Sequence, residues 1–462
     1  MRIFRVLAAC SLPWLSAGVA LGAEPDPKVV ATWASGAMEA RVAFDRAVDP
    51  TLATAAVGRS IGFGAGDPSA KAGRPGGDRG ALRVASARLA DGGRTLILVT
   101  DPHPREATYA LKLAGVKAPG ASGPGAEVDV AYTLGGVEAT WSAEGDRSKG
   151  AGWSGWWPEL DPAACRAGLA GSSEHDRLWP LLAGPGRLAL RTLVALPAGA
   201  VTLRIEADAP FEATFGQESA TSAATPAGGQ RATLKGESTG DAIDLGLTLK
   251  TGAQGLHLAV AATAAGSPEG RAIPKAAFVL PWAPPALPSA APAEAPPAAL
   301  LSGGDPTKGR AVFYGEQAKC ATCHKVRGEG GSVGPELTAL AGVDRAWVYR
   351  NIVEPSASIH PDYVSYTVAM KDGRIAMGVV RADGPDALQV GDIDAKTTRL
   401  PRAEVDEIRP SASSIMPVGL LGAIGEERTR DLLAFLTEPA PKPGLQPAPT
   451  PSTPPGSPAA RP

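Results

Sequence analysis

The sequence predicts a multidomain protein with two N-terminal all-β, sandwich-like domains and a C-terminal, mostly α domain that carries a small SH3-like β insertion. Three observations support this prediction. The chain of 462 residues has room for about three domains. Glycine (56) and proline (44) are abundant and aromatic residues are sparse, which favours β-rich modules and linkers. Helix signals gather near the C-terminus, where Asp305 and Pro306 open one helix and residues 426–436 form another.

Residues 1–23 have the features of a signal peptide. Arg2 and Arg5 supply positive charge, residues 6–20 are largely apolar, and small residues surround Ala23. The apolar run is short and is interrupted by Pro13, so we expect no transmembrane anchor after cleavage. The predicted location is the periplasm or the cell envelope.

Residues 28–134 are predicted to form the first β domain. Residues 40–44, 94–99 and 107–113 are strand-like and are separated by turns, a spacing typical of a β-sandwich. The segments FDRAVDP and TYALKLAGV resemble parts of bacterial Ig-like modules. This resemblance implies a scaffold or spacer without chemistry of its own.

Residues 135–284 are predicted to form a second domain with a sandwich or jelly-roll-like fold. Residues 188–196 and 201–207 alternate across a Pro-Ala-Gly-Ala turn, and residues 242–249 and 256–260 are expected to form a hairpin-like pair.

Three tryptophans, Trp153, Trp156 and Trp157, stand out in the second domain. They are either an aromatic platform for a sugar or large rings packed at the edge of a β core. We favour packing, because no convergent set of acids or amides is evident nearby in the sequence. The dispersed histidines of the β domains are expected to be structural; these are His103, His175 and His257.

Residues 285–302 are predicted to be a Pro/Ala linker, and residues 438–462 a disordered Pro-rich tail. The formal net charge is −2, so nothing suggests nucleic-acid binding.

The most informative stretch is Cys320-Ala-Thr-Cys323-His324, which has the spacing of a c-type haem attachment site. On a short helical turn, both sulfurs can face one porphyrin edge and add to its vinyl groups, while His324 ligates the iron. A structural zinc site would need a second Cys/His pair, but the only other cysteines are Cys10 and Cys165. A disulfide would leave His324 unexplained. Cys165 is expected to be buried and inert.

Residues 328–337, rich in glycine, are expected to form a tight loop close to the porphyrin. Pro335 would offer its carbonyl oxygen to the Nδ1–H of His324, which would fix the tautomer of the proximal ligand.

Residues 303–437 resemble the planctomycete-type haem-binding cytochrome c family. The matching segments are 319–326 (KCATCHKV), 328–337 (GEGGSVGPEL), 354–359 (EPSASI), 414–421 (SIMPVGLL) and 431–436 (DLLAFL). The resemblance implies one covalently attached haem c, a class I-like arrangement and a small β insertion. It also implies that Gly309 lets the first helix cross the last near Leu432 and Phe435. Pro335 and Leu337 would lie beside the cofactor.

A low-spin haem needs a sixth ligand, and Met416 is the predicted one. It precedes Pro417 and so lies in a loop, where a thioether can reach the iron. His360, which precedes Pro361, is an alternative ligand. Met370 and Met377 flank a predicted hairpin turn, and core packing explains both.

The long spacing between His324 and Met416 is attributed to the β insertion at 363–409. Its predicted strands are 363–370, 374–381, 387–390 and 397–400. The insertion either shields a haem edge, binds a redox partner or is passive; the sequence leaves these open.

The expected function is one-electron transfer by an exported monohaem cytochrome with His324 and Met416 as iron ligands, without catalysis of its own. Its partner would be an exported dehydrogenase or another cytochrome. Two alternatives remain. One is an envelope or polysaccharide-binding protein that contacts glycan through its β domains and has an accessory haem module. The other is a haem sensor or enzyme with an open distal site.

Overall fold

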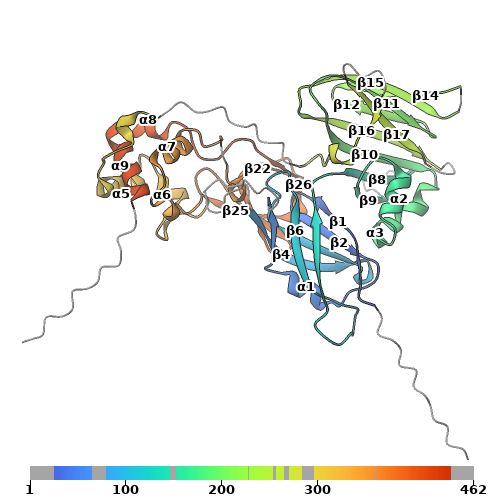
Figure 1. Cartoon of the computed structure of the whole chain (residues 1–462), viewed down its shortest axis with the longest axis horizontal. Coiled ribbons are helices and arrows are strands. Elements are labelled where there is room, and N and C mark those ends of the chain that lie inside the picture. The colour runs from blue at the N-terminus through green and yellow to red at the C-terminus, as the bar shows by residue number, and fades with distance from the viewer. Residues whose placement is uncertain are drawn as a thin grey trace, which may run out of the picture.

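The computed structural model describes residues 25–64, 80–145, 152–226, 228–252, 256–264, 270–283, 296–357 and 359–438. Strands dominate these ranges, and their pairing is antiparallel (Figure 1). The predicted signal peptide at 1–23, most of the linker (285–295) and the tail from residue 439 onward lie outside the described residues.

The first domain is built from one continuous seven-stranded sheet in the order β1-β2-β5-β4-β3-β6-β7. Strands β1 and β7, at the two ends of this order, approach each other, so the sheet curls around its core. The expected Ig-like sandwich of two separate sheets is therefore replaced by a single path of strands. The elements are β1 (Val29–Gly36), β2 (Glu39–Phe44), α1 (Thr51–Ala56), β3 (Ser60–Phe63), β4 (Gly80–Ala90), β5 (Thr95–Thr100), β6 (Tyr109–Val116) and β7 (Ala126–Tyr132).

The second domain is a sandwich of two sheets that share one core. One sheet has the order β13-β12-β16-β10-β8-β9, with β19 beside β10, and the other has the order β14-β15-β11-β17-β18. Its elements are β8 (Val137–Ala143), β9 (Trp153–Trp157), α2 (Pro162–Gly168), α3 (Ser173–Asp176), α4 (Leu178–Leu182), β10 (Gly186–Ala195), β11 (Gly199–Ala207), β12 (Phe211–Phe215), β13 (Glu218–Thr221), β14 (Ala223–Ala224), β15 (Gln230–Ser238), β16 (Ala242–Thr251), β17 (Leu258–Ala264), β18 (Arg271–Ala272) and β19 (Phe278–Val279). The prediction of β-sandwich structure is confirmed for this domain.

The expected hairpin of residues 242–249 and 256–260 is wrong. Strand β16 pairs with β10 and β12, whereas β17 pairs with β11 in the opposite sheet. Likewise, β10 and β11 lie in different sheets. Each strand buries alternate side chains in the core that the two sheets share. The same alternation results whether two consecutive strands pair as a hairpin or lie in opposite sheets.

The C-terminal region combines short helices with strands. Its elements are α5 (Pro306–Tyr314), α6 (Cys320–Cys323), β20 (Lys325–Val326), β21 (Glu329–Gly330), α7 (Arg345–Val353), β22 (Ser365–Met370), β23 (Ile375–Asp383), β24 (Ala387–Gly391), β25 (Thr397–Pro401), β26 (Val405–Pro410), α8 (Leu420–Ile424) and α9 (Glu426–Thr437). The prediction of a mostly α C-terminal domain is wrong. Short helices, ended by residues such as Gly315 and Gly425, share this region with a five-stranded antiparallel sheet that has its own core.

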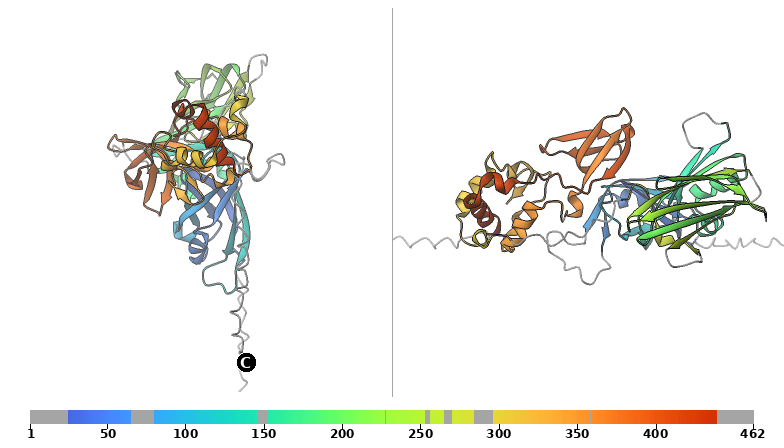
Figure 2. Two further views of the ribbon diagram at one scale, coloured as in Figure 1. Left: turned by 90° about the vertical axis from the view of Figure 1, so that its left-hand side faces the viewer. Right: turned by 90° about the horizontal axis from the view of Figure 1, so that it is seen from above.

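That sheet, β25-β24-β23-β22-β26, lies between the helices and the first domain (Figure 2). Tyr366 donates a hydrogen bond to the His103 carbonyl (3.2 Å), and Ala382 N donates to the Asp101 carboxylate (2.8 Å). Met38, in the turn between β1 and β2, belongs to the buried cluster of this sheet. The insertion therefore attaches the helical region to the first β domain.

Candidate functional site

The Cys320–His324 segment forms a single helical turn. His324 N donates to the Cys320 carbonyl (3.0 Å) and Thr322 N to that of Lys319 (3.0 Å). Both thiols are free and partly buried, and Cys320 packs against the apolar cluster of α5, α7, α8 and α9. The turn thus holds two thiols and an imidazole within five consecutive residues.

The loop at residues 328–337 is hydrogen-bonded across this turn. Gly331 N donates to the Ala321 carbonyl (2.8 Å), Gly334 N to that of Cys323 (2.8 Å) and Leu337 N to that of Lys325 (2.7 Å). These bonds bring the two backbones so close that side chains do not fit between them. A Cβ at residue 331 would overlap the Thr322 carbonyl, and one at residue 334 would lie 2.6 Å from Cε1 of His324. Glycine is therefore required at both positions by close approach.

The imidazole of His324 has a defined tautomer. Its Nδ1 lies 2.9 Å from the Pro335 carbonyl oxygen, as expected from the sequence. Because a carbonyl only accepts, Nδ1 carries the proton, and the neutral ring keeps a lone pair on Nε2. Burial lowers the pKa of His324, against the raising effect of the Pro335 hydrogen bond. The ring is therefore neutral at pH 7 and suited to bind a metal through Nε2.

The thiols differ in their surroundings. Burial raises the pKa of Cys320 to about 11. Burial also raises the pKa of Cys323, and the carboxylates of Asp392 and Asp394 add to this effect. These two acids lie in the β24–β25 turn, so the insertion reaches the candidate site. At the same turn, a Cβ on Gly391 would lie 2.9 Å from a Val333 methyl.

Helices α5 and α9 cross at Gly309, as the sequence implied. A Cβ at this glycine would overlap the Asp431 carbonyl and lie 2.8 Å from Cβ of Phe435. Phe313 and Phe435 contact each other one turn further along, with ring centroids 5.7 Å apart. The Asp431 carboxylate accepts from Asp305 N (2.7 Å), which connects the beginning of α5 to α9. This crossing supports the cluster on which Cys320 packs.

The remaining predicted residues are distributed around this site. Leu337 packs against the helical cluster. Met416 is partly buried in the loop before α8, and its N–H donates to Ser414 Oγ (3.1 Å). The side chain of His360 accepts from Asp362 N (3.2 Å). Met370 is buried in the core of the insertion, but Met377 is 61% exposed, so core packing does not explain Met377.

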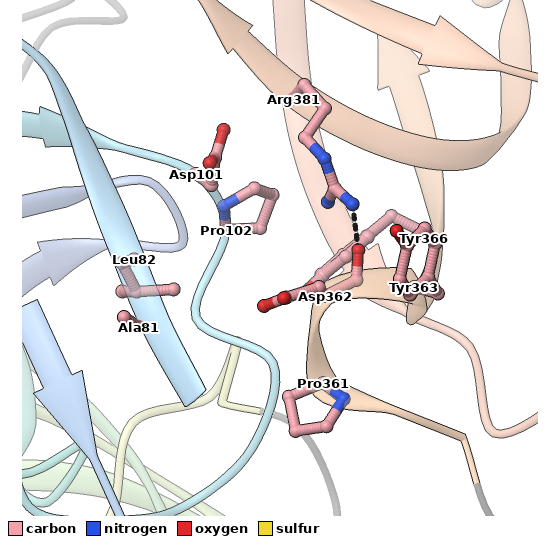
Figure 3. A pocket seen from close by; sticks show the side chains of 9 residues that line it. All are labelled: Ala81, Leu82, Asp101, Pro102, Pro361, Asp362, Tyr363, Tyr366 and Arg381. Carbon is pink, nitrogen blue, oxygen red and sulfur yellow. Dashed lines mark hydrogen bonds between the residues drawn. The ribbon is translucent and has the colours of Figure 1, made fainter. Parts of the chain in front are cut away.

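A cavity of about 170 Å³ lies between the insertion and the first domain, beside their direct contacts (Figure 3). Asp101 and Pro102 line it on one side, and Tyr363 and Arg381 on the other. The Asp101 carboxylate is bound by Ala382 N, and Arg381 donates to the Asp362 carbonyl. The two charged groups that face each other across it, Asp101 and Arg381, thus already have partners in the protein, which favours a gap in the packing over a binding site.

The tryptophans of β9 divide between the two interpretations. Trp153 and Trp157 are buried, as packing predicts. Trp156 is half-buried and lines a second cavity between the β domains.

His103 is buried, with Nδ1 2.9 Å from the Ala37 carbonyl and Nε2 3.0 Å from Tyr132 Oη, which fits the structural role expected for it.

The sequence left open whether the insertion contributes to the site, and it did not indicate which residues of the insertion approach the motif. Gly391, Asp392 and Asp394 approach the motif only in the tertiary structure, and no local pattern marks them.

Among the described residues, no cluster of three or more His, Cys, Asp or Glu side chains is arranged to hold a metal ion. Within the same ranges, no helix combines the length and hydrophobicity needed to cross a lipid bilayer.

No family model matches the sequence, and no curated protein matches it. Solved structures give weak likenesses. A PA14 sugar-binding domain from an RTX adhesin is 11% identical, with 32% of this chain and 98% of that domain covered at a TM-score of 0.23. An anti-sigma factor domain-containing protein from Clostridium clariflavum is 8% identical (52% and 84% covered, TM-score 0.23). Domains 1–6 of the surface layer protein SbsC are 11% identical (54% and 54% covered, TM-score 0.19). These TM-scores are too low to establish a shared fold.

Proposed function

We propose that the chain is an exported monohaem c-type cytochrome that transfers one electron at a time. The observation that carries the proposal is the Cys320–His324 turn, in which two free thiols precede a histidine whose Nδ1 is bound to Pro335. Cys320 and Cys323 would form thioethers with one haem, and Nε2 of His324 would be the proximal ligand. When bound, the haem iron supplies the reversible one-electron chemistry.

The residues present fit this group in three respects. The thiols are two positions apart on one turn and are not joined in a disulfide. The neutral imidazole presents a lone pair for a metal. The glycine loop leaves no side chain between itself and the histidine ring. The resemblance of residues 303–437 to the planctomycete-type haem-binding cytochrome c family adds support.

Met416 is proposed as the distal ligand, because it lies on the partly buried loop that leads into α8, and Leu421 of α8 packs in the same cluster as Cys320. A thioether ligand raises the reduction potential relative to a second histidine. The electron partner would be an exported dehydrogenase or another cytochrome, and the protein would act in the periplasm or at the cell envelope.

The test is expression in a bacterium with an intact haem c maturation system, followed by a haemochrome assay and optical spectroscopy. Wild type should contain one haem and be low-spin. Met416→Ala should become high-spin, whereas the control Met377→Ala, at an exposed methionine, should match wild type. A Met416→Ala spectrum identical to wild type would contradict the proposed ligand, and loss of low-spin character in His360→Ala would favour His360.

A further inference from the structure

A second cavity, of about 300 Å³, lies between the first and second β domains. Strands β1 and β2 form one wall, and β8, β9 and α3 form the other. The side chains that give it chemical character are Arg41, Glu138, Ser154, Trp156, Glu174 and Trp282. It is separate from the Cys320–His324 turn, since no residue of that turn or its loop lines it.

Two half-buried indoles supply the apolar surface of this cavity. Trp156 is held in place on both sides: its ring stacks on buried Trp33 with centroids 5.9 Å apart and an 11° interplanar angle, and its Nε1 donates to the Gly135 carbonyl (2.9 Å). Trp282 follows strand β19 and lines the same space. Rigid indoles offer flat apolar area at low entropic cost, which suits the C–H faces of a sugar ring.

A fixed polar group stands next to the indoles. Arg41 donates to Glu39 (2.8 Å) and to Glu174 (2.7 Å), and the Glu174 side chain is only 3% exposed. Burial lowers the pKa of Arg41, but the two carboxylates raise it by more. The guanidinium therefore keeps its charge. The ion pair is therefore preorganised, with its hydrogen-bonding geometry set before a ligand arrives.

Glu138 is the carboxylate in this cavity without a side-chain partner. Across the described part of the chain, no hydrogen bond or ion pair to its carboxylate is present, and its neighbour across the strands, Arg191, instead pairs with Asp244 (3.3 Å). Burial raises the pKa of Glu138, Arg191 opposes this effect, and Glu407 and Asp244 add to it. A half-buried carboxylate that lacks a partner is stabilised by a ligand that donates hydrogen bonds to it.

Charge narrows the ligand class. Two carboxylates, Glu138 and Glu174, line the cavity with one guanidinium, Arg41, which is also paired with Glu39. The net negative charge disfavours acidic sugars and favours a cationic group beside Glu138. Hydroxyls line both walls of the cavity, from Ser35 on β1 and from Thr140 and Ser154 on β8 and β9, and they match a ligand rich in hydroxyl groups.

The geometry points to a binding site for an amino-substituted pyranose, with its ring against Trp156 and Trp282 and its ammonium group paired with Glu138. The inference is independent of haem attachment, because it uses other residues. It also assigns different roles to the three neighbouring tryptophans: Trp153 and Trp157 pack, and Trp156 binds.

The test is isothermal titration calorimetry on the full mature chain at pH 7 with three probes: D-glucosamine, D-glucose and D-glucuronate. Glucosamine should bind most tightly, and glucuronate should not bind. Glu138→Gln should weaken glucosamine binding at least fivefold, while Glu212→Gln, an exposed glutamate on β12 of the same domain, should leave it unchanged.

Trp282→Ala is the second variant, because Trp156 also stacks on Trp33 and its removal would disturb the domain contact. Trp282→Ala should weaken glucosamine and glucose alike, with an unchanged circular dichroism spectrum. Three results would overturn the assignment: no binding of glucosamine, equal binding of glucuronate, or full glucosamine affinity in Glu138→Gln.

Discussion

Nδ1 of His324 lies 2.9 Å from the carbonyl oxygen of Pro335, and this bond assigns the proton of the imidazole to Nδ1. The intervening loop reaches the ring only because residue 334 has no side chain. A Cβ there would lie 2.6 Å from Cε1 and 2.8 Å from Nδ1 of His324. The geometry of the proposed proximal ligand therefore depends on one glycine.

Gly334→Ala should displace the imidazole and weaken its ligation of the iron. The expected loss of affinity is roughly tenfold, as for the loss of other residues that orient metal ligands. We expect a smaller low-spin fraction in the optical spectrum, and partial recovery when free imidazole is added. The control is Gly422→Ala on α8, where a Cβ meets nothing within 4 Å. A wild-type spectrum for Gly334→Ala would contradict the role of this loop.

Gly309→Ala should destabilise the helical region by forcing α5 away from α9. Its Cβ would lie 2.5 Å from the Asp431 carbonyl carbon and 2.8 Å from Cβ of Phe435. Overpacking of this kind costs about 1–3 kcal/mol in the free energy of unfolding. Urea denaturation followed by helical circular dichroism measures it, again with Gly422→Ala as control. Equal midpoints for the two variants would show that the helices have room to separate.

Acid should destabilise the β domains through buried His103. Burial lowers its pKa to about 4, so the folded state keeps the ring neutral while the unfolded chain takes up a proton below about pH 6.5. Stability is therefore full above pH 6.5 and falls as the pH drops toward 4, by about 2 kcal/mol at pH 5 for this residue. His103→Gln should reduce the difference in unfolding free energy between pH 7 and pH 5 by that amount.

The matched control for the pH experiment is His257→Gln, at an exposed histidine. Glu138 and Glu174 have raised pKa values and change the stability in the opposite direction. Their contribution is the same in wild type and in both variants, so it cancels when the change in unfolding free energy between pH 7 and pH 5 is compared among them. An unchanged pH dependence in His103→Gln would mean that the ring takes up a proton as readily in the folded state as in the unfolded state.

Cys165 should be unreactive in the native protein. Its side chain is fully buried next to the Glu159 carbonyl, and burial raises the pKa of its thiol to about 12. Iodoacetamide at pH 8 should alkylate it only in denaturant, whereas Ser219→Cys, which places a thiol on exposed β13, should be alkylated under native conditions. Native alkylation of Cys165 would reveal local opening of α2.

The strands of the β domains were predictable, because alternate residues are buried along them; β10 buries every second residue from Gly186 to Val194. Their partners were not predictable. Alternation tells which face of β16 is buried, but not that β17 crosses to the other sheet. The mostly α prediction failed because the helix signals were real but short, and the sheet at 365–410 fills much of the same region.

The candidate site was also predictable only in part. Cys320, His324 and Pro335 lie within sixteen residues, so local spacing was enough to relate them. The approach of Gly391 to Val333, and of Asp392 to Cys323, depends on how the insertion packs between the helices and the first domain. The hydrogen bond from Tyr366 to the His103 carbonyl had no sequence signal either.

The central claim is covalent attachment of haem at Cys320 and Cys323, and mass spectrometry under denaturing conditions tests it most directly. After expression with an intact haem c maturation system, the polypeptide should carry the mass of one haem on the peptide that contains residues 320–324, and Cys320→Ala/Cys323→Ala should carry none. A wild-type mass equal to that of the polypeptide alone would contradict the account.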